Sequence, residues 1–137
     1  MKHYLLDTSA LLTLRDDERG AEAVAKILKQ AEADKVKVFG CFMTLMEILY
    51  RVWKDENETE ARLAYAQCQS LPIVWIHENT ELLEQASKIK ANYPLSLADA
   101  WIAASAVLRD AWLVHKDPEF ETLAFLKQKP LPYKVKD

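Results

Sequence analysis

The sequence predicts an α/β fold, a three-layer α/β/α sandwich around a central parallel sheet of four to five strands. Short apolar, β-branched segments alternate along the chain with longer segments in which apolar residues recur at helical spacing. This alternation is typical of β-α-β units, which run the strands in parallel and place helices on both faces of the sheet. No composition break or internal repeat interrupts the 137 residues. We therefore expect a single domain over 1–137.

The N-terminal half begins with an apolar segment that ends at Asp7 and leads through two hydroxyl residues into a helical pattern. A charged connection at 15–20 precedes an amphipathic helix and a β-branched strand, and the helix after that strand is apolar around most of its circumference. In order, we expect a strand at 4–6, helices at 8–14 and 21–33, a strand at 36–40, and helices at 44–54 and 58–68.

The C-terminal half continues the alternation. An apolar segment after Pro72 predicts a central strand, and Asn79 or Thr80 can cap the next helix. Pro94 separates that helix from an alanine-rich one. In order, we expect a strand at 73–76, helices at about 80–92 and at 97–108, a strand at 111–114, a short helix ending near 126, and an edge strand at 133–135.

Composition excludes several classes of protein. Half of the residues are hydrophobic, but 28% are charged and no long apolar run occurs, so we expect no membrane span. The N-terminus enters a strand directly, without the apolar segment of a signal peptide, and we expect a cytoplasmic protein. Only two glycines are present, which excludes a P-loop and a dinucleotide-binding turn. Cys41 and Cys68 are far apart in the sequence, and we expect both to be buried hydrophobes.

The net charge of −3 and the pI near 5.7 provide no overall electropositive field for binding nucleic acid. An acidic protein whose carboxylates are spread over its surface repels a polyanionic substrate, so the net charge counts against such a substrate. It does not if the acids are concentrated in one cleft that binds divalent cations, because the cations reverse the charge that a substrate phosphate meets.

Four acidic residues occupy comparable places in the predicted fold. Asp7 and Asp117 each follow a strand, and Glu47 and Asp99 each lie in the first turn of a largely apolar helix. Each also has a purely structural interpretation. Asp7 can be a helix N-cap, and Asp117 before Pro118 can be another. Glu47 and Asp99 complete S/T-x-x-D/E patterns, which are typical of capping boxes.

Taken together, the four acids favour a metal site. In an open α/β sheet, strand ends and the helices that follow them meet at one edge, where we expect all four carboxylates. Apolar Met46 and Ile48 flank Glu47, and neither Glu47 nor Asp99 has a lysine or arginine beside it in sequence. Burying an unpartnered carboxylate is unfavourable, and a shared cation would resolve this. Carboxylate oxygens suit Mg²⁺ or Mn²⁺, whereas zinc would recruit His or Cys.

Four motifs then occur in order: Leu5-Leu6-Asp7-Thr8-Ser9, Leu45-Met46-Glu47-Ile48, Leu97-Ala98-Asp99-Ala100-Trp101-Ile102-Ala103-Ala104, and Leu113-Val114-His115-Lys116-Asp117-Pro118-Glu119-Phe120. With these motifs the chain resembles the PIN-domain family, in particular the small VapC-type ribonuclease toxins, over 4–135. The resemblance implies a compact α/β/α fold with a parallel sheet. It also implies a divalent-metal centre and hydrolysis of RNA phosphodiesters.

By this resemblance, Asp7, Glu47, Asp99 and Asp117 correspond to the acidic catalytic quartet of the family. Asp7 and Asp99 are the foremost candidates for direct ligands of Mg²⁺ or Mn²⁺, and Asp117 is the third. Ser9 matches a small hydroxyl residue that in the family often supports the metal or its water.

His115 departs from the pattern, because relatives commonly have Thr, Ser or Asn there; an imidazole could replace the usual hydrogen bond to the site.

Glu121 is a possible fifth acid, although a solvated helical position is favoured. Arg51 and Lys116 are near the acids in sequence; contact with a substrate phosphate is one interpretation, and solvated charges are the favoured one. The four tryptophans fall in segments predicted to be buried, which favours core positions over base stacking; they are Trp53, Trp75, Trp101 and Trp112.

We therefore expect a Mg²⁺- or Mn²⁺-dependent endoribonuclease in which a metal-held water attacks a phosphodiester in line. The resemblance implies the toxin of a type II toxin-antitoxin pair, with a homodimer and a cognate antitoxin contacting the helices in 21–68. Alternatives are a PIN ribonuclease with an RNA-processing role outside such systems, or an inactive protein-interaction module whose acids only cap helices. Phosphoryl transfer of the haloacid-dehalogenase kind would need a second Asp where this chain has Ser9.

Overall fold

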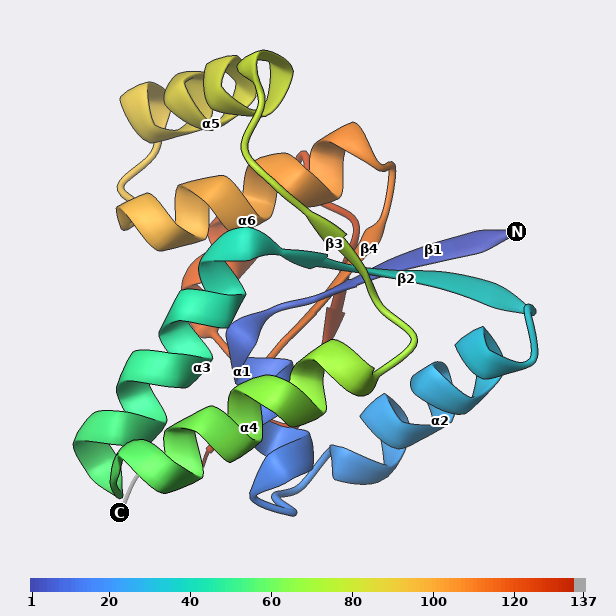
Figure 1. Cartoon of the computed structure of the whole chain (residues 1–137). Coiled ribbons are helices and arrows are strands. Elements are labelled where there is room, and N and C mark those ends of the chain that lie inside the picture. The colour runs from blue at the N-terminus through green and yellow to red at the C-terminus, as the bar shows by residue number, and fades with distance from the viewer. Residues whose placement is uncertain (135–137) are drawn as a thin grey trace.

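The computed structural model describes residues 1–134, in which a five-stranded sheet is flanked by helices (Figure 1). Every pairing is parallel and the spatial order is β3-β2-β1-β4-β5, which confirms the predicted three-layer α/β/α fold. The elements are β1 (Lys2–Leu6), α1 (Thr8–Arg15), α2 (Ala21–Glu32), β2 (Val36–Cys41), α3 (Phe42–Asp55), α4 (Glu58–Ser70), β3 (Val74–Ile76), α5 (Thr80–Asn92), α6 (Leu97–Leu108), β4 (Trp112–His115), the 3₁₀ helix η1 (Pro118–Thr122) and β5 (Gln128–Pro130).

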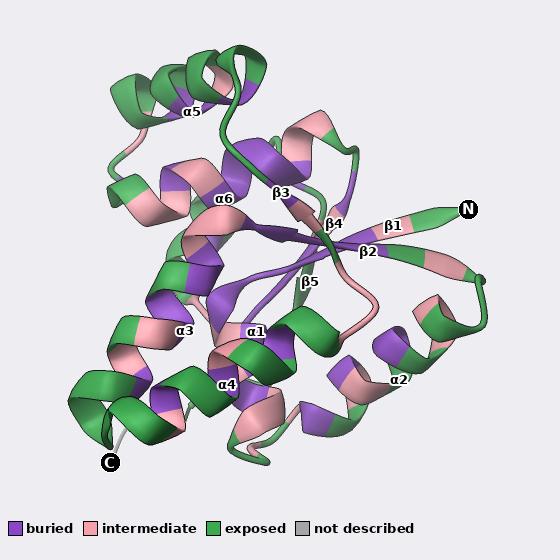
Figure 2. Cartoon of the chain, in the orientation of Figure 1, coloured by how far each residue is buried: buried purple, intermediate pink, exposed green. Residues whose placement is uncertain are grey.

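The central strand β1 contributes to the hydrophobic core on both faces of the sheet. Leu5 packs into the core on one face, and Tyr4 and Leu6 pack into the core on the other, as the two-residue period of a strand requires. The end of β1 is buried on both sides (Figure 2). A strand covered on both faces needs apolar residues at successive positions, which explains why this segment is apolar throughout.

Helices α5 and α6 cover one face of the sheet, and α1 to α4 pack on the other (Figure 1). The alanine-rich sequence of α6 allows the helix to approach the sheet closely, and Ala100, Ala103 and Ala104 are almost completely buried there. The opposite core is built from larger side chains, such as Ile27 of α2 and Ile48 of α3.

The connectivity creates a switch point beside β1. From β1 the chain proceeds outward to β2 and then β3, and only afterwards returns to place β4 on the other side of β1. The connections therefore leave in opposite directions at the carboxyl ends of β1 and β4. In open α/β sheets this crevice is where ligands bind. Asp7 follows β1 directly, and Asp117 lies two residues after β4.

Several predicted boundaries differ from the observed ones by one or two residues, and the short helix predicted to end near 126 ends at Thr122. The prediction of a central strand at 73–76 is wrong, because β3, within residues 1–134, pairs only with β2 and forms an edge of the sheet. Helix α3 begins at Phe42 instead of 44, directly after β2, with Cys41 as its N-cap. The edge strand predicted at 133–135 is wrong: the C-terminal edge strand is β5 at Gln128–Pro130, and Tyr133 and Lys134 have no regular structure. Residue 135 lies outside the described residues. Pro130 is tolerated in β5 because an edge strand has one unpaired side.

The tryptophan prediction is wrong for Trp53, whose exposure of 43% follows from its place on the outer face of α3. Trp75, Trp101 and Trp112 are half-buried rather than core residues. Cys41 and Cys68 are buried free cysteines, as predicted. Within residues 1–134, no helix combines the length and apolarity needed to cross a membrane.

Candidate active site

Asp7 lies at the junction of β1 and α1, where it is 4% exposed. Its carboxylate caps α1 by accepting hydrogen bonds from the backbone N–H and the hydroxyl of Ser9. The Ser9 hydroxyl in turn accepts from the backbone N–H of Lys116 at 2.9 Å. Ser9 therefore joins the ends of β1 and β4 at the switch point. Burial raises the pKa of Asp7, an effect that the Ser9 hydrogen bonds oppose.

Glu47 is 7% exposed in the second turn of α3, and protein donors occupy both of its oxygens. Oε1 accepts from the Thr8 hydroxyl at 2.7 Å, and Oε2 accepts from Arg51 Nη2 at 2.9 Å. The capping box expected over Thr44–Glu47 is absent, because Cys41 is the N-cap and Thr44 lies inside the helix, with its hydroxyl 3.0 Å from that of Thr8.

Arg51 corrects the expectation that Glu47 has no cation beside it. The guanidinium is one helical turn further along α3, so the pair lies on the same helix face although the residues are not adjacent in sequence. The expectation that Lys116 is a solvated charge is also wrong. Its side chain is 5% exposed, and Nζ lies 3.4 Å from Glu18 Oε1.

Asp99 is half-buried in the first turn of α6, whose N-cap is Ser96. The Asp99 backbone N–H donates to the Ser96 hydroxyl at 3.1 Å, so the predicted cap exists. Burial is the largest cause that raises the pKa of Asp99 to about 7, and the negative charges of Asp7, Asp117 and Glu47 raise it further. Asp99 is therefore placed where carboxylates repel one another.

Asp117 caps η1, with Pro118 at the start of that helix as predicted. Its Oδ1 accepts from the Glu119 backbone N–H at 3.0 Å. Its own backbone N–H donates to Nδ1 of His115 at 3.1 Å. The imidazole of His115, predicted as a supporting group, is completely buried beneath this turn.

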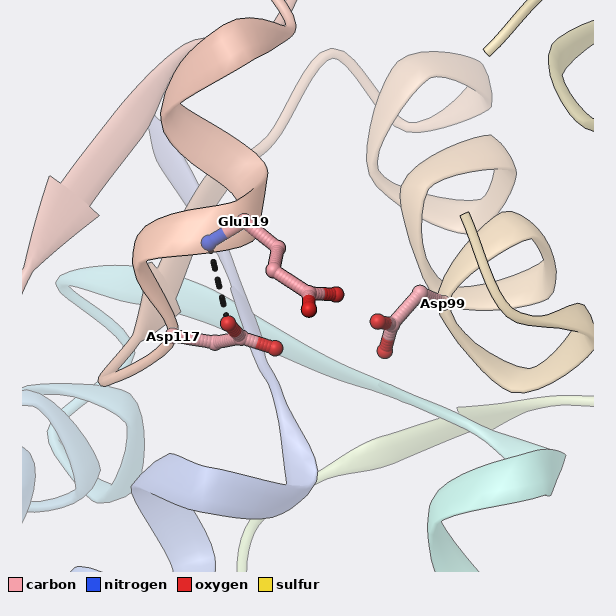
Figure 3. Close-up of side chains that lie close together, drawn as sticks. All are labelled: Asp99, Asp117 and Glu119. Carbon is pink, nitrogen blue, oxygen red and sulfur yellow. Dashed lines mark hydrogen bonds between the residues drawn. The ribbon is translucent and has the colours of Figure 1, made fainter. Parts of the chain in front are cut away.

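Three carboxylates meet at this edge: Asp99, Asp117 and Glu119 each offer one oxygen, and these oxygens lie within 4.8 Å of one another (Figure 3). Asp7 and Glu47 are outside this close group, although their charges act on Asp99. Carboxylate oxygens alone form the group, which fits a hard divalent cation such as Mg²⁺ or Mn²⁺. Capping and converging are compatible, because each acid that caps a helix retains an oxygen for another partner.

Glu119 was not among the predicted site residues. It follows Pro118 in an exposed 3₁₀ turn, and only the geometry of that turn directs its carboxylate toward Asp99 (Figure 3). The Asp-Pro-Glu sequence directly after a strand was the available signal. Glu121 is exposed and accepts a hydrogen bond from the Tyr133 hydroxyl at 2.6 Å, away from the three acids.

The site is thus a group of carboxylates at the switch point of a parallel α/β/α fold. Comparison with known proteins identifies the family. The family model for the PIN domain matches residues 4–126, and the chain belongs to the PIN-domain family. No curated protein matches it significantly in sequence.

Solved structures with this fold include VapBC proteins. The chain is similar to VapBC2 from Rickettsia felis, bound to a promoter DNA fragment, with 15% identity, a TM-score of 0.77 and coverage of 95% of this chain and 99% of that one. It is similar to DNA-bound VapBC from Salmonella typhimurium, with 18% identity, a TM-score of 0.76 and coverage of 95% and 98%. VapC20 from Mycobacterium tuberculosis, described as a toxin that cleaves the sarcin-ricin loop, has 18% identity, a TM-score of 0.68 and coverage of 90% and 97%.

Proposed function

We propose that the chain is a Mg²⁺- or Mn²⁺-dependent endoribonuclease that hydrolyses RNA phosphodiesters and acts as the toxin of a type II toxin-antitoxin pair. The observation that carries this proposal is the convergence of Asp99, Asp117 and Glu119 at the switch point of a PIN fold. The similar VapBC structures and the RNA-cleaving VapC20 support it. An RNA substrate also agrees with the expected cytoplasmic location.

In this proposal Asp7, Asp99 and Asp117 hold the cation, and Glu119 is near enough to join them. The bound cation would activate a water for in-line attack and stabilise the charge that develops on the phosphodiester. Burial and the neighbouring negative charges raise the pKa of Asp99 to about 7, and a cation held there would favour the ionised carboxylate. Ser9 holds the Asp7 carboxylate in place through its hydroxyl.

Glu47 supports the site through its neighbours. Thr8 and Arg51 hold its two oxygens, so Glu47 has little freedom to turn toward the cation. The Arg51 side chain is 42% exposed and uses one terminal nitrogen for Glu47. Its remaining N–H groups are available to a substrate phosphate, which a planar guanidinium binds well.

The experiment that tests the activity is cleavage of a mixed RNA substrate by the purified protein with Mg²⁺, with Mn²⁺, and with a chelator. We expect cleavage with either metal and none with the chelator. Calorimetry with Mn²⁺ provides a second measurement, because an inactive module whose acids only cap helices has no saturable site. Absence of both cleavage and Mn²⁺ binding would contradict the proposal and favour the interaction module.

A toxin also needs a partner, and the chain has an exposed apolar surface for one. Met46, Tyr50 and Trp53 of α3 and Leu63 of α4 are each more than 40% exposed. We propose that a homodimer and a cognate antitoxin cover part of this surface, as expected from 21–68. Induced expression should arrest bacterial growth, and expression of Asp99→Asn should not. An active ribonuclease that leaves growth unchanged would point to RNA processing instead.

The alternative function, phosphoryl transfer of the haloacid-dehalogenase kind, is not favoured by the residues around Asp7. It needs a second aspartate two residues after Asp7, and Ser9 instead donates its hydroxyl to the Asp7 carboxylate. An Asp7 that accepts two hydrogen bonds from Ser9 and whose charge acts on Asp99 is better suited to supporting a cation than to attacking a phosphate.

A further inference from the structure

A buried polar pair, His115 and Gln128, lies behind the Asp117 turn. His115 is the last residue of β4 and is completely buried, and Gln128 is the first residue of the neighbouring edge strand β5. His115 Nε2 and Gln128 Oε1 are 2.9 Å apart. Neither side chain belongs to the acidic group, so binding of a cation by that group does not by itself explain why this polar pair is buried here.

The orientation of the Gln128 amide is determined by two carbonyl oxygens. Gln128 Nε2 lies 2.8 Å from the carbonyl of Phe120 and 3.2 Å from that of Leu123. A carbonyl can only accept, so the donating NH₂ must face these two oxygens. Gln128 Oε1 is consequently the atom that faces His115, and it can only accept.

This orientation determines the tautomer of His115. An acceptor at Gln128 Oε1 requires the proton to be on His115 Nε2. On the other side of the ring, the Asp117 backbone N–H donates to Nδ1 at 3.1 Å, which requires Nδ1 to carry no proton. Both contacts agree on a neutral imidazole with its proton on Nε2, and a ring of the opposite tautomer would lose both hydrogen bonds.

The pair thereby connects the edge strand to the acid-bearing turn. Gln128 holds the carbonyls of Phe120 and Leu123 at the C-terminal side of η1, and through His115 it holds the backbone of Asp117 at the N-terminal side. The segment held in this way carries Asp117 and Glu119, two of the three converging acids. The position of both carboxylates thus depends on a series of hydrogen bonds that begins at Gln128, outside the acidic group.

We propose that Gln128 is a positioning residue for the candidate metal centre: it fixes the Nε2–H tautomer of His115, whose Nδ1 holds the Asp117 turn so that Asp117 and Glu119 face Asp99. The inference rests on the proposed function in that the centre binds a divalent cation. Partners that orient metal ligands typically change metal affinity by about 10-fold to 100-fold when removed.

The first test is Gln128→Met, which preserves side-chain length but neither donates nor accepts a strong hydrogen bond. We expect the dissociation constant for Mn²⁺, measured by calorimetry on the full chain, to rise about 10-fold. The matched control is Leu131→Ala, because Leu131 is 3% exposed in the same C-terminal segment but packs into the core on the other face of the sheet. This control loses stability without losing the polar chain, so its Mn²⁺ affinity should change less than about 2-fold.

Equal losses of Mn²⁺ affinity in Gln128→Met and Leu131→Ala would overturn the positioning role, because the effect would then be one of general stability. Unchanged affinity in Gln128→Met, with normal binding by the wild type, would overturn it as well. A wild-type chain that binds no Mn²⁺ would instead contradict the proposed metal centre.

The second test needs no substitution. Nitrogen-15 spectra of the histidine rings in the wild-type chain report which nitrogen carries the proton, and we expect Nε2–H for His115. A His115 ring protonated on Nδ1 would overturn the inference, whether or not the chain binds Mn²⁺. This measurement separates failure of the positioning role from failure of the proposed function.

Discussion

The acidic edge of the sheet has two regions that differ in how their charges are balanced. We refer to Asp7 and Glu47 as the inner pair, and to Asp99, Asp117 and Glu119 as the outer trio. The inner pair is buried, and its oxygens accept hydrogen bonds from Ser9, Thr8 and Arg51. The outer trio has no such set of side-chain donors. Within residues 1–134, no lysine, arginine or histidine nitrogen lies within 4.0 Å of its carboxylates.

The two regions therefore differ in whether side chains of the protein already balance their negative charge. A buried carboxylate is stable when its oxygens have donors, and the inner pair meets that condition with residues of the chain itself. The outer trio brings carboxylates together, and burial, followed by the negative charges of Asp7, Asp117 and Glu47, raises the pKa of Asp99. A divalent cation would balance the outer trio with Asp7 as a further ligand, while Glu47 stays bound to Thr8 and Arg51.

The largest expected effect comes from neutralising the outer trio. Asp99→Asn should reduce metal-dependent RNA cleavage by roughly 100-fold or more, because a ligand of the cation is lost while the shape is preserved. Asp117→Asn should act in the same direction. Asp34→Asn, in an exposed turn, is a matched neutralisation and should leave the rate unchanged. Cleavage by Asp99→Asn at the wild-type rate would show that the outer trio is not the catalytic centre.

The next effect concerns the stability of the inner pair. Arg51→Met removes the guanidinium from Glu47 and leaves a carboxylate that is 7% exposed with one donor fewer. We expect a loss of about 1–2 kcal/mol in the free energy of unfolding, measured in urea, because Arg51 is partly solvated. The double variant with Glu47→Gln should be more stable than Arg51→Met alone. If Arg51→Met has wild-type stability, the burial of Glu47 does not depend on the guanidinium of Arg51.

The outer trio should also make stability depend on pH in the absence of metal. The pKa of Asp99 is about 7 in the folded chain, against an ordinary value of 3.8. The folded state therefore binds the proton more tightly, and stability should fall as the pH rises from about 4 to about 7 and then level off. Thermal unfolding across this range, with a chelator present, provides the measurement. Burial raises the pKa of Asp7 in the same direction, so Asp7 adds to the trend.

Asp99→Asn provides the control for that pH dependence. The amide does not titrate, so the fall in stability should be reduced, and at pH 8 without metal the variant should be more stable than the wild type by roughly 1 kcal/mol or more. Addition of Mn²⁺ should stabilise the wild type and not the variant. The opposite slope, with stability rising toward pH 7, would contradict a carboxyl group whose pKa is raised by burial and by neighbouring negative charges.

The smallest expected effect is that of Glu121→Gln. Glu121 is exposed on η1, beside the outer trio in sequence, but its carboxylate accepts from the Tyr133 hydroxyl instead of facing Asp99. Mn²⁺ affinity and the rate of cleavage should stay within about 2-fold of the wild type. A larger loss would extend the outer trio to a fourth acid.

Much of the fold was predictable because its signals are local. The apolar strand before Asp7 and the alanine-rich helix at Leu97–Leu108 were evident from composition and spacing. The edge strand was misplaced because β5 is a short polar segment, Gln128–Pro130, that owes its conformation to pairing with β4. Trp53 was assigned to the core because its helix is apolar on most sides, and only the packed fold shows which side stays exposed.

The predicted acids are at the expected edge, but their roles stay predictions that the experiments above test. The residues that were missed have a common feature. The contact of Arg51 with Glu47 spans a helical turn, Glu119 approaches Asp99 through a 3₁₀ turn, and Gln128 contacts His115 across a pair of strands, so none of these partners is adjacent in sequence. That a single domain covers 1–137 also stays a prediction, and one cooperative unfolding transition would support it.

Periodicity and chain order were enough to predict most of the elements, the parallel α/β/α class and the location of four acids near strand ends. The convergence of Asp99, Asp117 and Glu119, and the hydrogen bonds that hold Asp7 and Glu47 to Ser9, Thr8 and Arg51, become evident only in the packed fold. The physical reason is that charge balance depends on distances of a few ångströms between side chains from different elements. Those distances exist only after the sheet and its helices have packed.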